Sequence, residues 1–150
     1  EYFRNYHQGL RLLPGAAQLL QEANCHCTCL ITNGETQIQT EKLRLLSLRG
    51  YFNHILISEE FGSSKPDLAI FQHALKLTKS QPHQAIMIGN NIPTDIAGAA
   101  NLGITTIWVN LHNWKAPHGY KRPDYEVPDP EGASELLRLI RAQTCRQSYP

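Results

Sequence analysis

Three loops of this sequence contain polar side chains that are suited to binding a phosphate group. Thr32 offers a hydroxyl directly after an apolar run, and we expect Asn33 and Gly34 beside it to leave their backbone N–H groups open. Lys65 supplies a positive charge that would stabilise the negative charge developing on a transferred phosphoryl group. These residues therefore predict an anion site that includes Lys65.

The third loop contains oxygen ligands rather than positive charge. Asn90 and Asp95 flank a turn that opens a helix, where side-chain oxygens could reach a hard cation such as Mg²⁺. Each residue also has an ordinary structural explanation. Thr32 could be a turn residue, Lys65 a solvated surface lysine and Asp95 a helix N-cap. Because these loops follow three successive predicted strands, we favour one shared site.

Three cysteines alternate with other residues early in the chain. Cys25, Cys27 and Cys29 have no C-x2-C pair as a partner, and Cys145 stands alone near the end. Alternation at period two predicts that the three thiols lie on one face of a strand and pack as small hydrophobes. Metal binding or redox chemistry at these thiols is the alternative.

The elements that must position these residues alternate regularly along the chain. Apolar residues at helical spacing predict a helix that begins at Pro14 and Gly15, and an amphipathic helix that Gly50 ends. Further helices are expected near residues 66–77, 95–102 and 132–142. The predicted strands cover residues 25–31, 54–58, 85–89 and 105–109, with a short edge strand at 125–127.

This order predicts the fold class. Strands that alternate with helices of 8 to 12 residues are typical of an α/β fold with a parallel sheet covered on both faces. In such sheets the ligand crevice lies beyond the carboxyl ends of the strands. The loops at residues 32–35, 59–66 and 89–95, and the loop from residue 110 onward, are therefore expected to surround the site.

Composition excludes several classes of partner. The chain has 150 residues and a formal net charge of +1, which does not favour a nucleic acid as partner. No apolar run approaches the roughly 20 residues that a membrane-spanning helix needs. The first residues are polar and aromatic and do not resemble a signal peptide. We therefore expect a cytoplasmic protein without a membrane partner.

Three segments together resemble a known family. They are L-I-T-N-G at residues 30–34, S-S-K-P-D at 63–67 and I-G-N-N-I-P-T-D-I-A-G-A-A-N-L-G at 88–103. They are similar to motifs two, three and four of the haloacid dehalogenase superfamily, in its capped subfamily of nucleotidases and sugar-phosphate phosphatases. The resemblance implies a three-layer Rossmann-like core. Residues 1–12 would be a remnant of the cap and linker, with residues 1–9 returning from the cap, and residues 13–150 a partial core domain.

The resemblance also implies a role for each site residue. In the family an aspartate attacks the phosphoryl group of a small phosphorylated metabolite, a second aspartate two residues on acts as general acid-base, and Mg²⁺ lies beside the fourth motif. Thr32 would then supply the phosphate hydroxyl, with Asn33 and Gly34 beside it. Lys65 would be the catalytic phosphate clamp, and Asn90 and Asp95 would be metal ligands.

Two departures from the family pattern weaken this chemistry. The nucleophile motif D-x-D-x-[TV] is absent, because the only aspartates are Asp67, Asp95, Asp124 and Asp129 and none closes an apolar strand. Asn90 stands where the family usually has an aspartate, so the metal site loses one formal charge and binds Mg²⁺ more weakly. We therefore expect this chain alone to be inactive.

The missing motif also leaves a structural gap. In the family, the first strand lies in the middle of the sheet. Without it, residues 25–31 with 54–58, and residues 85–89 with 105–109, would form two half-sheets whose inner edges are unpaired. The halves could close on each other, another chain could supply a strand, or the segment could belong to a longer protein. We favour the last explanation.

The sequence thus predicts a Mg²⁺-dependent phosphomonoester hydrolase when the protein is complete. The alternative is a non-catalytic relative that binds or senses a phosphorylated ligand. The substrate is not predicted, because nearly all of the cap is missing. The loop after Val109 could contact a leaving group, although ordinary loop packing is the simpler explanation. The aromatic residues in and beside it are Trp108, His112, Trp114, His118 and Tyr120.

Overall fold

The computed structural model describes residues 9–147, with side chains as far as residue 143. Most of the predicted cap remnant therefore lies outside the described residues. In chain order the elements are α2 (Ala16–Ala23), β1 (Cys29–Thr32), α3 (Thr36–Leu45), η1 (Arg49–Tyr51), β2 (His54–Ile57), α4 (Ser58–Phe61), α5 (Leu68–Leu77), η2 (Pro82–Gln84), β3 (Ile86–Gly89), η3 (Ile92–Ile96), α6 (Ala97–Asn101), β4 (Thr105–Val109), β5 (Tyr125–Val127) and α7 (Pro130–Gln147).

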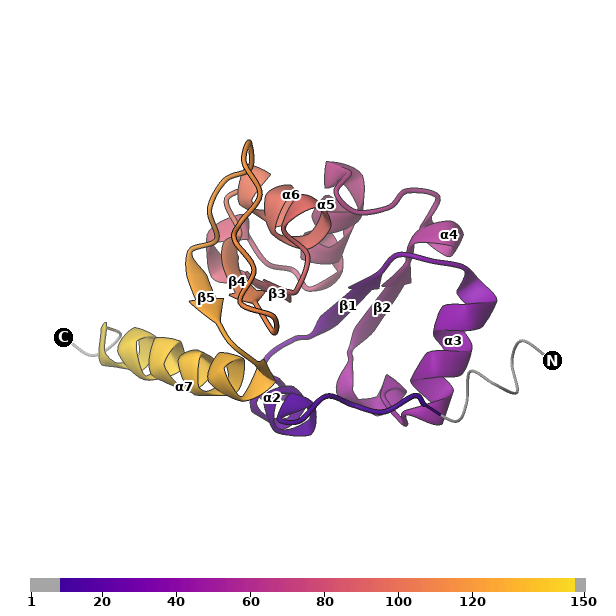
Figure 1. Ribbon diagram of the computed structural model, residues 1–150, viewed down its shortest axis with the longest axis horizontal. Coiled ribbons are helices and arrows are strands. Elements are labelled where there is room, and N and C mark those ends of the chain that lie inside the picture. Colours follow the sequence, from indigo (N-terminus) through magenta and orange to yellow (C-terminus); the bar gives the residue numbers. More distant parts are fainter. Residues whose placement is uncertain (1–8, 148–150) are drawn as a thin grey trace.

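The strands form two separate parallel sheets, which confirms the predicted half-sheets. β1 pairs with β2, with Cys29 opposite His54 and Thr32 opposite Ile57. In the second sheet β4 lies between β3 and β5, and all three run parallel. Within the described residues, β1 and β3 face each other across the middle of the fold without pairing (Figure 1). The halves have therefore not closed on each other.

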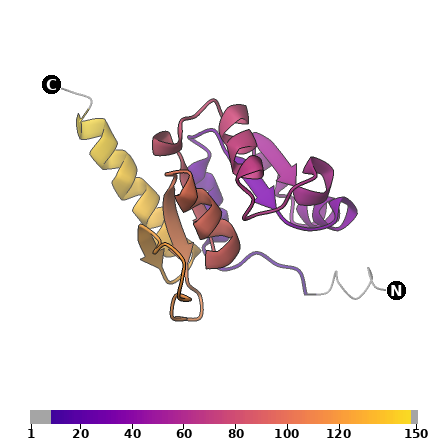
Figure 2. The same cartoon turned by 90° about the horizontal axis from the view of Figure 1, so that it is seen from above.

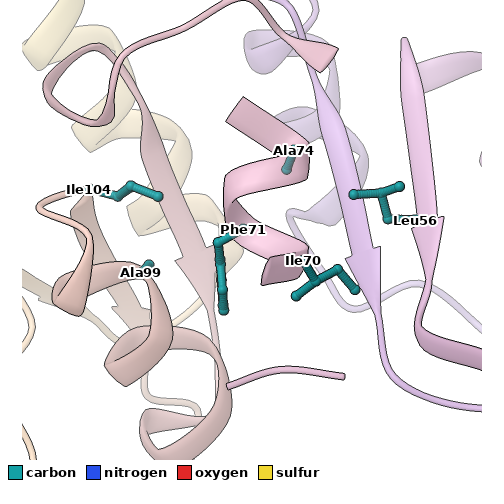
Figure 3. Close-up of a cluster of buried hydrophobic side chains, with 6 residues drawn as sticks. All are labelled: Leu56, Ile70, Phe71, Ala74, Ala99 and Ile104. Atoms are coloured by element: carbon teal, nitrogen blue, oxygen red, sulfur yellow. The ribbon is translucent and has the colours of Figure 1, made fainter. Parts of the chain in front are cut away.

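Helices α5 and α6 cover one face of both half-sheets. Ile70 and Phe71 of α5 are almost completely buried, as is Ala99 of α6. Figure 3 shows Ile70 directed toward the β1–β2 pair and Phe71 toward α6, so α5 fills the space between the halves on this side. The buried members of this cluster are Leu56, Ile70, Phe71, Ala74, Ala99 and Ile104. Burial of large apolar side chains is the main stabilising contribution here.

Helices α2 and α7 pack side by side over the opposite face (Figures 1 and 2). Their apolar sides meet β3, β4 and β5 in a second cluster, which includes Ile107, Val127 and Leu137. Glu22 of α2 also accepts ion pairs from Arg138 at 3.0 Å and Arg141 at 3.1 Å. The first and last described helices are therefore joined, and the fold has the predicted three layers.

The short strand β5 is held by a buried side-chain network. Thr106 is fully buried in β4, and its N–H and Oγ1 both donate to Asp124 Oδ2, at 2.8 and 2.9 Å. The Asp124 N–H returns a hydrogen bond to Thr106 Oγ1 at 3.0 Å. Asp124 immediately precedes β5, so this exchange aligns the strand against β4 and confirms the predicted edge strand.

The prediction that three cysteines share a strand face was wrong for two of them. The chain turns after α2, where the His26 N–H donates to Ala23 O, and β1 begins only at Cys29. Cys25 and Cys27 are exposed, whereas Cys29 is partly buried. Burial raises the pKa of the Cys29 thiol to about 11, and the nearby Cys27 adds to this effect. Cys29 therefore stays protonated and packs as a small hydrophobe, as expected.

Some element boundaries also differ from the sequence prediction. Residues 58–61 form the short helix α4 instead of belonging to a strand and loop, because the chain turns at Ser58 and the Gly62 N–H donates back to Ser58 O at 2.9 Å. The helix expected over 95–102 begins earlier, as the π-helical turn η3, and becomes regular only at Ala97. The last helix extends further at both ends than residues 132–142.

Among residues 9–147, no helix has the length and apolar character needed to cross a bilayer.

Candidate functional site

The predicted site residues follow the carboxyl ends of β1, β2 and β3. Thr32 is the last residue of β1 and Gly89 the last of β3, while Lys65 lies in the connection that leads from α4 into α5. Because the paired strands are parallel, their carboxyl ends share one edge of each half-sheet. Lys65 contacts both Asn33, after β1, and Asp95, after β3, so these loops are on the same side of the fold.

Lys65 and Asp95 form a buried ion pair at this edge. Lys65 Nζ lies 2.7 Å from Asp95 Oδ1, and the two side chains are only 11% and 8% exposed. Lys65 is therefore not the solvated surface lysine that was the alternative explanation. Two charges buried together have lost most of their hydration, so each depends on the other for stabilisation. The pair is therefore shielded from water at the edge where the sequence predicts the site.

The turn that follows β3 holds the Asp95 carboxylate in place. Asp95 Oδ2 accepts from the Asn91 N–H at 3.1 Å, and Oδ1 accepts from Thr94 Oγ1 at 3.3 Å. Asn91 is the N-cap of η3, since its side chain accepts from the Thr94 N–H at 3.0 Å. The alternative explanation of Asp95 as an N-cap was therefore wrong. π-helical turns are rare in proteins, and those that occur are often found at functional sites.

Asn33 positions the backbone of Lys65, a role that sequence reasoning did not find. Asn33 Oδ1 accepts from the Lys65 N–H at 2.9 Å, and Nδ2 donates to Lys65 O at 3.0 Å. One side chain therefore satisfies both backbone groups of the lysine and ties the end of β1 to the loop before α5. No spacing in the sequence indicates such a contact, because the residues are far apart along the chain.

Two predicted phosphate-binding groups have protein partners. Thr32 Oγ1 donates to Gln39 Oε1 at 3.1 Å, so the hydroxyl lies on the first turns of α3. The Gly34 N–H donates to Ser58 Oγ at 2.9 Å, which corrects the expectation that it is open. Gln39 and Ser58 were both missed, because each lies on a neighbouring element that only the fold brings near β1.

Asn90 precedes Asp95 by five residues in the sequence, and it is exposed. Its backbone oxygen accepts from Trp108 Nε1 at 3.1 Å, which ties the turn after β3 to β4. The preceding residue, Gly89, permits a close approach of Asp95: a Cβ placed there would lie 2.5 Å from Asp95 Cβ. The glycine is therefore required by the packing of this turn against the end of β3.

The side chains present supply only part of a magnesium site. Mg²⁺ prefers about six oxygen ligands in octahedral geometry, several of them water. Within residues 9–147 no group of three or more His, Cys, Asp or Glu side chains is placed to hold a metal ion. The predicted ligands here are the Asp95 carboxylate, which already contacts Lys65, and the exposed Asn90 amide. Further ligands would have to be water or groups other than the described His, Cys, Asp and Glu side chains.

A cleft of about 980 Å³ separates the two half-sheets. Cys29 and Ile31 of β1 line one side, and Ile86 and Ile88 of β3 line the other. The cleft is bounded on its two faces by residues of α2 and α7 and by residues of α5, including Leu19, Leu137 and Phe71. Its lining is mostly apolar, and it lies between β1 and β3, where the family's first strand was expected.

The fold and these loops define a family that comparison with known proteins also identifies. Residues 1–109 match the model of the haloacid dehalogenase-like hydrolase family. The chain therefore belongs to the haloacid dehalogenase-like hydrolases, as its motifs predicted.

Relatives with established names include phosphatases of small molecules. The pyrimidine 5'-nucleotidase YjjG of Escherichia coli is 37% identical over 127 residues, which are 83% of this chain and 56% of that protein. The glyceraldehyde 3-phosphate phosphatase of Pyrococcus furiosus is 40% identical over 101 residues, 66% of this chain and 42% of that protein. The chain thus spans about half the length of the relatives it matches.

Solved structures show the same fold. The HAD-hydrolase YfnB of Bacillus subtilis, bound to magnesium, superimposes with a TM-score of 0.81 at 26% identity over 91% of this chain and 60% of that chain. A 2-haloacid dehalogenase of Pseudomonas syringae has a TM-score of 0.78 and 31% identity, over 93% of this chain and 58% of that one. The α/β architecture with parallel strands is therefore the family fold.

Proposed function

We propose that the complete protein is a Mg²⁺-dependent hydrolase of small phosphomonoesters, and that residues 1–150 alone are inactive. The observation that carries this proposal is the buried pair of Lys65 and Asp95, 2.7 Å apart at the carboxyl edge of the half-sheets. The named relatives support the class of substrate, since they include a nucleotidase and a sugar-phosphate phosphatase. A cytoplasmic location and a small phosphorylated metabolite as partner belong to the same proposal.

In this proposal Lys65 is the phosphate clamp. Its backbone is held by Asn33 and its ammonium group by Asp95, so the charge is oriented before the substrate arrives. A preorganised cation in a site with little water stabilises charge on a transferred phosphoryl group more strongly than a mobile surface lysine would. Thr32 would turn its hydroxyl from Gln39 toward a phosphoryl oxygen, which requires only a side-chain rotation.

The nucleophile would come from a segment outside these residues, in the cleft between β1 and β3. Its aspartate would attack phosphorus, and the bond from phosphorus to the leaving-group oxygen would break as that oxygen takes a proton from a neighbouring acid. Water would then hydrolyse the aspartyl phosphate and release phosphate. Bound Mg²⁺ would offset the phosphoryl charge. Asp95 and Asn90 would supply two of its oxygen ligands.

The proposal is tested with a protein in which the preceding genomic segment has been restored. We expect this protein to release phosphate from p-nitrophenyl phosphate in the presence of Mg²⁺, and the 150-residue chain to release none. Lys65→Ala should lower kcat/KM by at least about a hundredfold, because it removes charge from the transition state. Lys76→Ala is the matched control, since Lys76 is an exposed lysine at the end of α5.

Two outcomes would contradict the proposal. A restored protein without turnover would exclude hydrolysis. If it nevertheless bound phosphate esters through Lys65 without Mg²⁺, the alternative of a non-catalytic ligand-binding protein would be supported. If Lys65→Ala and Lys76→Ala lowered kcat/KM equally, the buried pair would have no special role in catalysis.

A further inference from the structure

The loop between β4 and β5 presents an aromatic pair that the phosphate site does not explain. Trp114 is 66% exposed, and the His112 ring lies against it with 4.7 Å between ring centroids. The loop protrudes from the body of the fold (Figure 2). Tryptophan is usually well buried, because its large ring gains much from leaving water. A tryptophan ring exposed to this degree therefore calls for an explanation.

The backbone of Trp114 is held firmly although its ring is exposed. Asn110 is only 5% exposed, and its Nδ2 donates to Trp114 O at 2.9 Å while its Oδ1 accepts from the Trp114 N–H at 2.9 Å. Asn110 Nδ2 also donates to Glu126 Oε1 at 2.6 Å, which anchors it beside β5. A buried amide thus fixes the backbone that carries an exposed indole ring. A backbone fixed in this way lowers the entropy cost of binding a ligand at the ring.

This surface leaves the sheet at the same edge as the phosphate site. Asn110 directly follows β4, which is the neighbour of β3, and Gly89 lies opposite Trp108 in the register. Trp108 Nε1 donates to Asn90 O, so the end of β4 is joined to the turn that carries Asp95. Neighbouring strands lie about 4.8 Å apart. The loop therefore begins within one or two strand spacings of the turn after β3.

We propose that His112 and Trp114 form a stacking surface for a planar ring on the leaving group, so that the protein selects nucleoside monophosphates. The proposal rests on the proposed function, because Lys65 would hold the phosphate end of the same molecule. Aromatic side chains stack on any nucleobase, whereas a sugar or triose phosphate offers no flat π face. Exposed Lys115 beside Trp114 adds positive charge near an anionic substrate.

Binding to the 150-residue chain provides the direct test. The probes are uridine 5'-monophosphate and ribose 5-phosphate, which share the ribose phosphate and differ only in the base. The chain has two tryptophans, so a fluorescence change on titration is assigned to Trp114 only where Trp114→Phe abolishes it. We expect uridine monophosphate to quench the fluorescence and to bind about tenfold more tightly than ribose phosphate.

Variants in the loop separate stacking from a general effect of the loop. Trp114→Ala should abolish the preference for uridine monophosphate, and Trp114→Phe should keep most of it when binding is measured by calorimetry. Tyr120→Ala is the control, because Tyr120 is a 45% exposed aromatic residue of the same loop. The exposure of Trp114 makes misfolding of these variants a minor concern, and circular dichroism checks it. Equal binding of both probes, no binding of the nucleotide at millimolar concentration, or a preference that survives Trp114→Ala overturns the proposal.

This inference and the proposed function can fail separately. A restored protein that hydrolyses both probes with equal kcat/KM would keep the phosphatase and exclude base selection. Base-dependent binding through Trp114 without any hydrolysis would keep the stacking surface and exclude the phosphatase.

Discussion

Lys65 and Asp95 are both largely shielded from water. Their mutual electrostatic attraction replaces part of the hydration that each charge has lost. The carboxylate gains two further donors from Asn91 and Thr94, and the lysine backbone is satisfied by Asn33. A buried pair of this kind contributes little compared with an apolar pair of the same size, but removal of one partner leaves an unpaired buried charge. The strong interdependence of the two residues can be measured.

A double-mutant cycle tests this interdependence. Lys65→Met should lower the free energy of unfolding by about 3–5 kcal/mol, because Asp95 would keep its charge without a cation. In the double variant with Asp95→Asn, the loss should be clearly smaller than the sum of the two single losses. Urea unfolding measures all four proteins. Additive losses would show that the two side chains do not stabilise each other.

At the scale of elements, the small residues of the 88–103 segment determine how closely α6 approaches α5. A Cβ built at Gly98 would lie 2.2 Å from Phe71 Cε2 and 3.0 Å from Pro66 O. Phe71 is almost completely buried, so its ring has little room to move. The glycine in D-I-A-G-A is thus a requirement of packing, and it brings the turn with Asp95 close to the loop with Lys65.

Gly98→Ala is therefore expected to destabilise the protein by about 1–3 kcal/mol, despite the higher helix propensity of alanine. Gly50→Ala is the matched control. Gly50 lies in η1, has no positive φ, and no atom lies within 4 Å of the Cβ that it would gain. Thermal unfolding of both variants measures the difference. A stable Gly98→Ala protein would show that α5 and α6 can separate at low cost.

At the scale of the whole molecule, the two half-sheets leave alternate backbone groups of β1 and β3 unpaired. Thr28 O accepts from the His54 N–H and Ala85 O from the Thr105 N–H, so alternation along each strand directs the backbone groups of Leu30 and Met87 to β2 and β4. The backbone groups of Ile31 and Ile88 consequently point into the cleft. The facing edges of β1 and β3 therefore each offer a row of backbone groups to which one further parallel strand could pair.

Hydrogen exchange can detect this alternation residue by residue. In the 150-residue chain, the Ile31 and Ile88 amides should exchange at least about tenfold faster than those of Leu30 and Met87, because only the latter are paired within the sheets. Restoring the preceding segment should slow amide exchange at Ile31 and Ile88, so that their exchange rates approach those of Leu30 and Met87. Equal protection in the chain alone, measured by NMR, would mean that the cleft is already closed.

Much of this architecture could be predicted from the sequence because its signals are local. Apolar spacing located the helices and strands, and the alternation of elements predicted the parallel order. The gap between β1 and β3 followed from one absent motif. The contacts of Asn33, Gln39 and Ser58 could not be predicted, because they depend on side chains that meet only after the strands pair. The late start of the cysteine strand, at Cys29, also depended on a turn that composition does not reveal.

The two helix pairs have a consequence for the order of assembly. One pair, α2 and α7, bounds the cleft on one face, and α5 bounds it on the other with α6 packed beside it. A strand cannot pass sideways through either layer once both are in place. We expect a central strand to join while these helix layers are still apart. In a complete chain the central strand and the two helix layers would then assemble in a single cooperative step. A peptide with the sequence of that strand, added after folding, would bind only when one helix layer separates from the sheets.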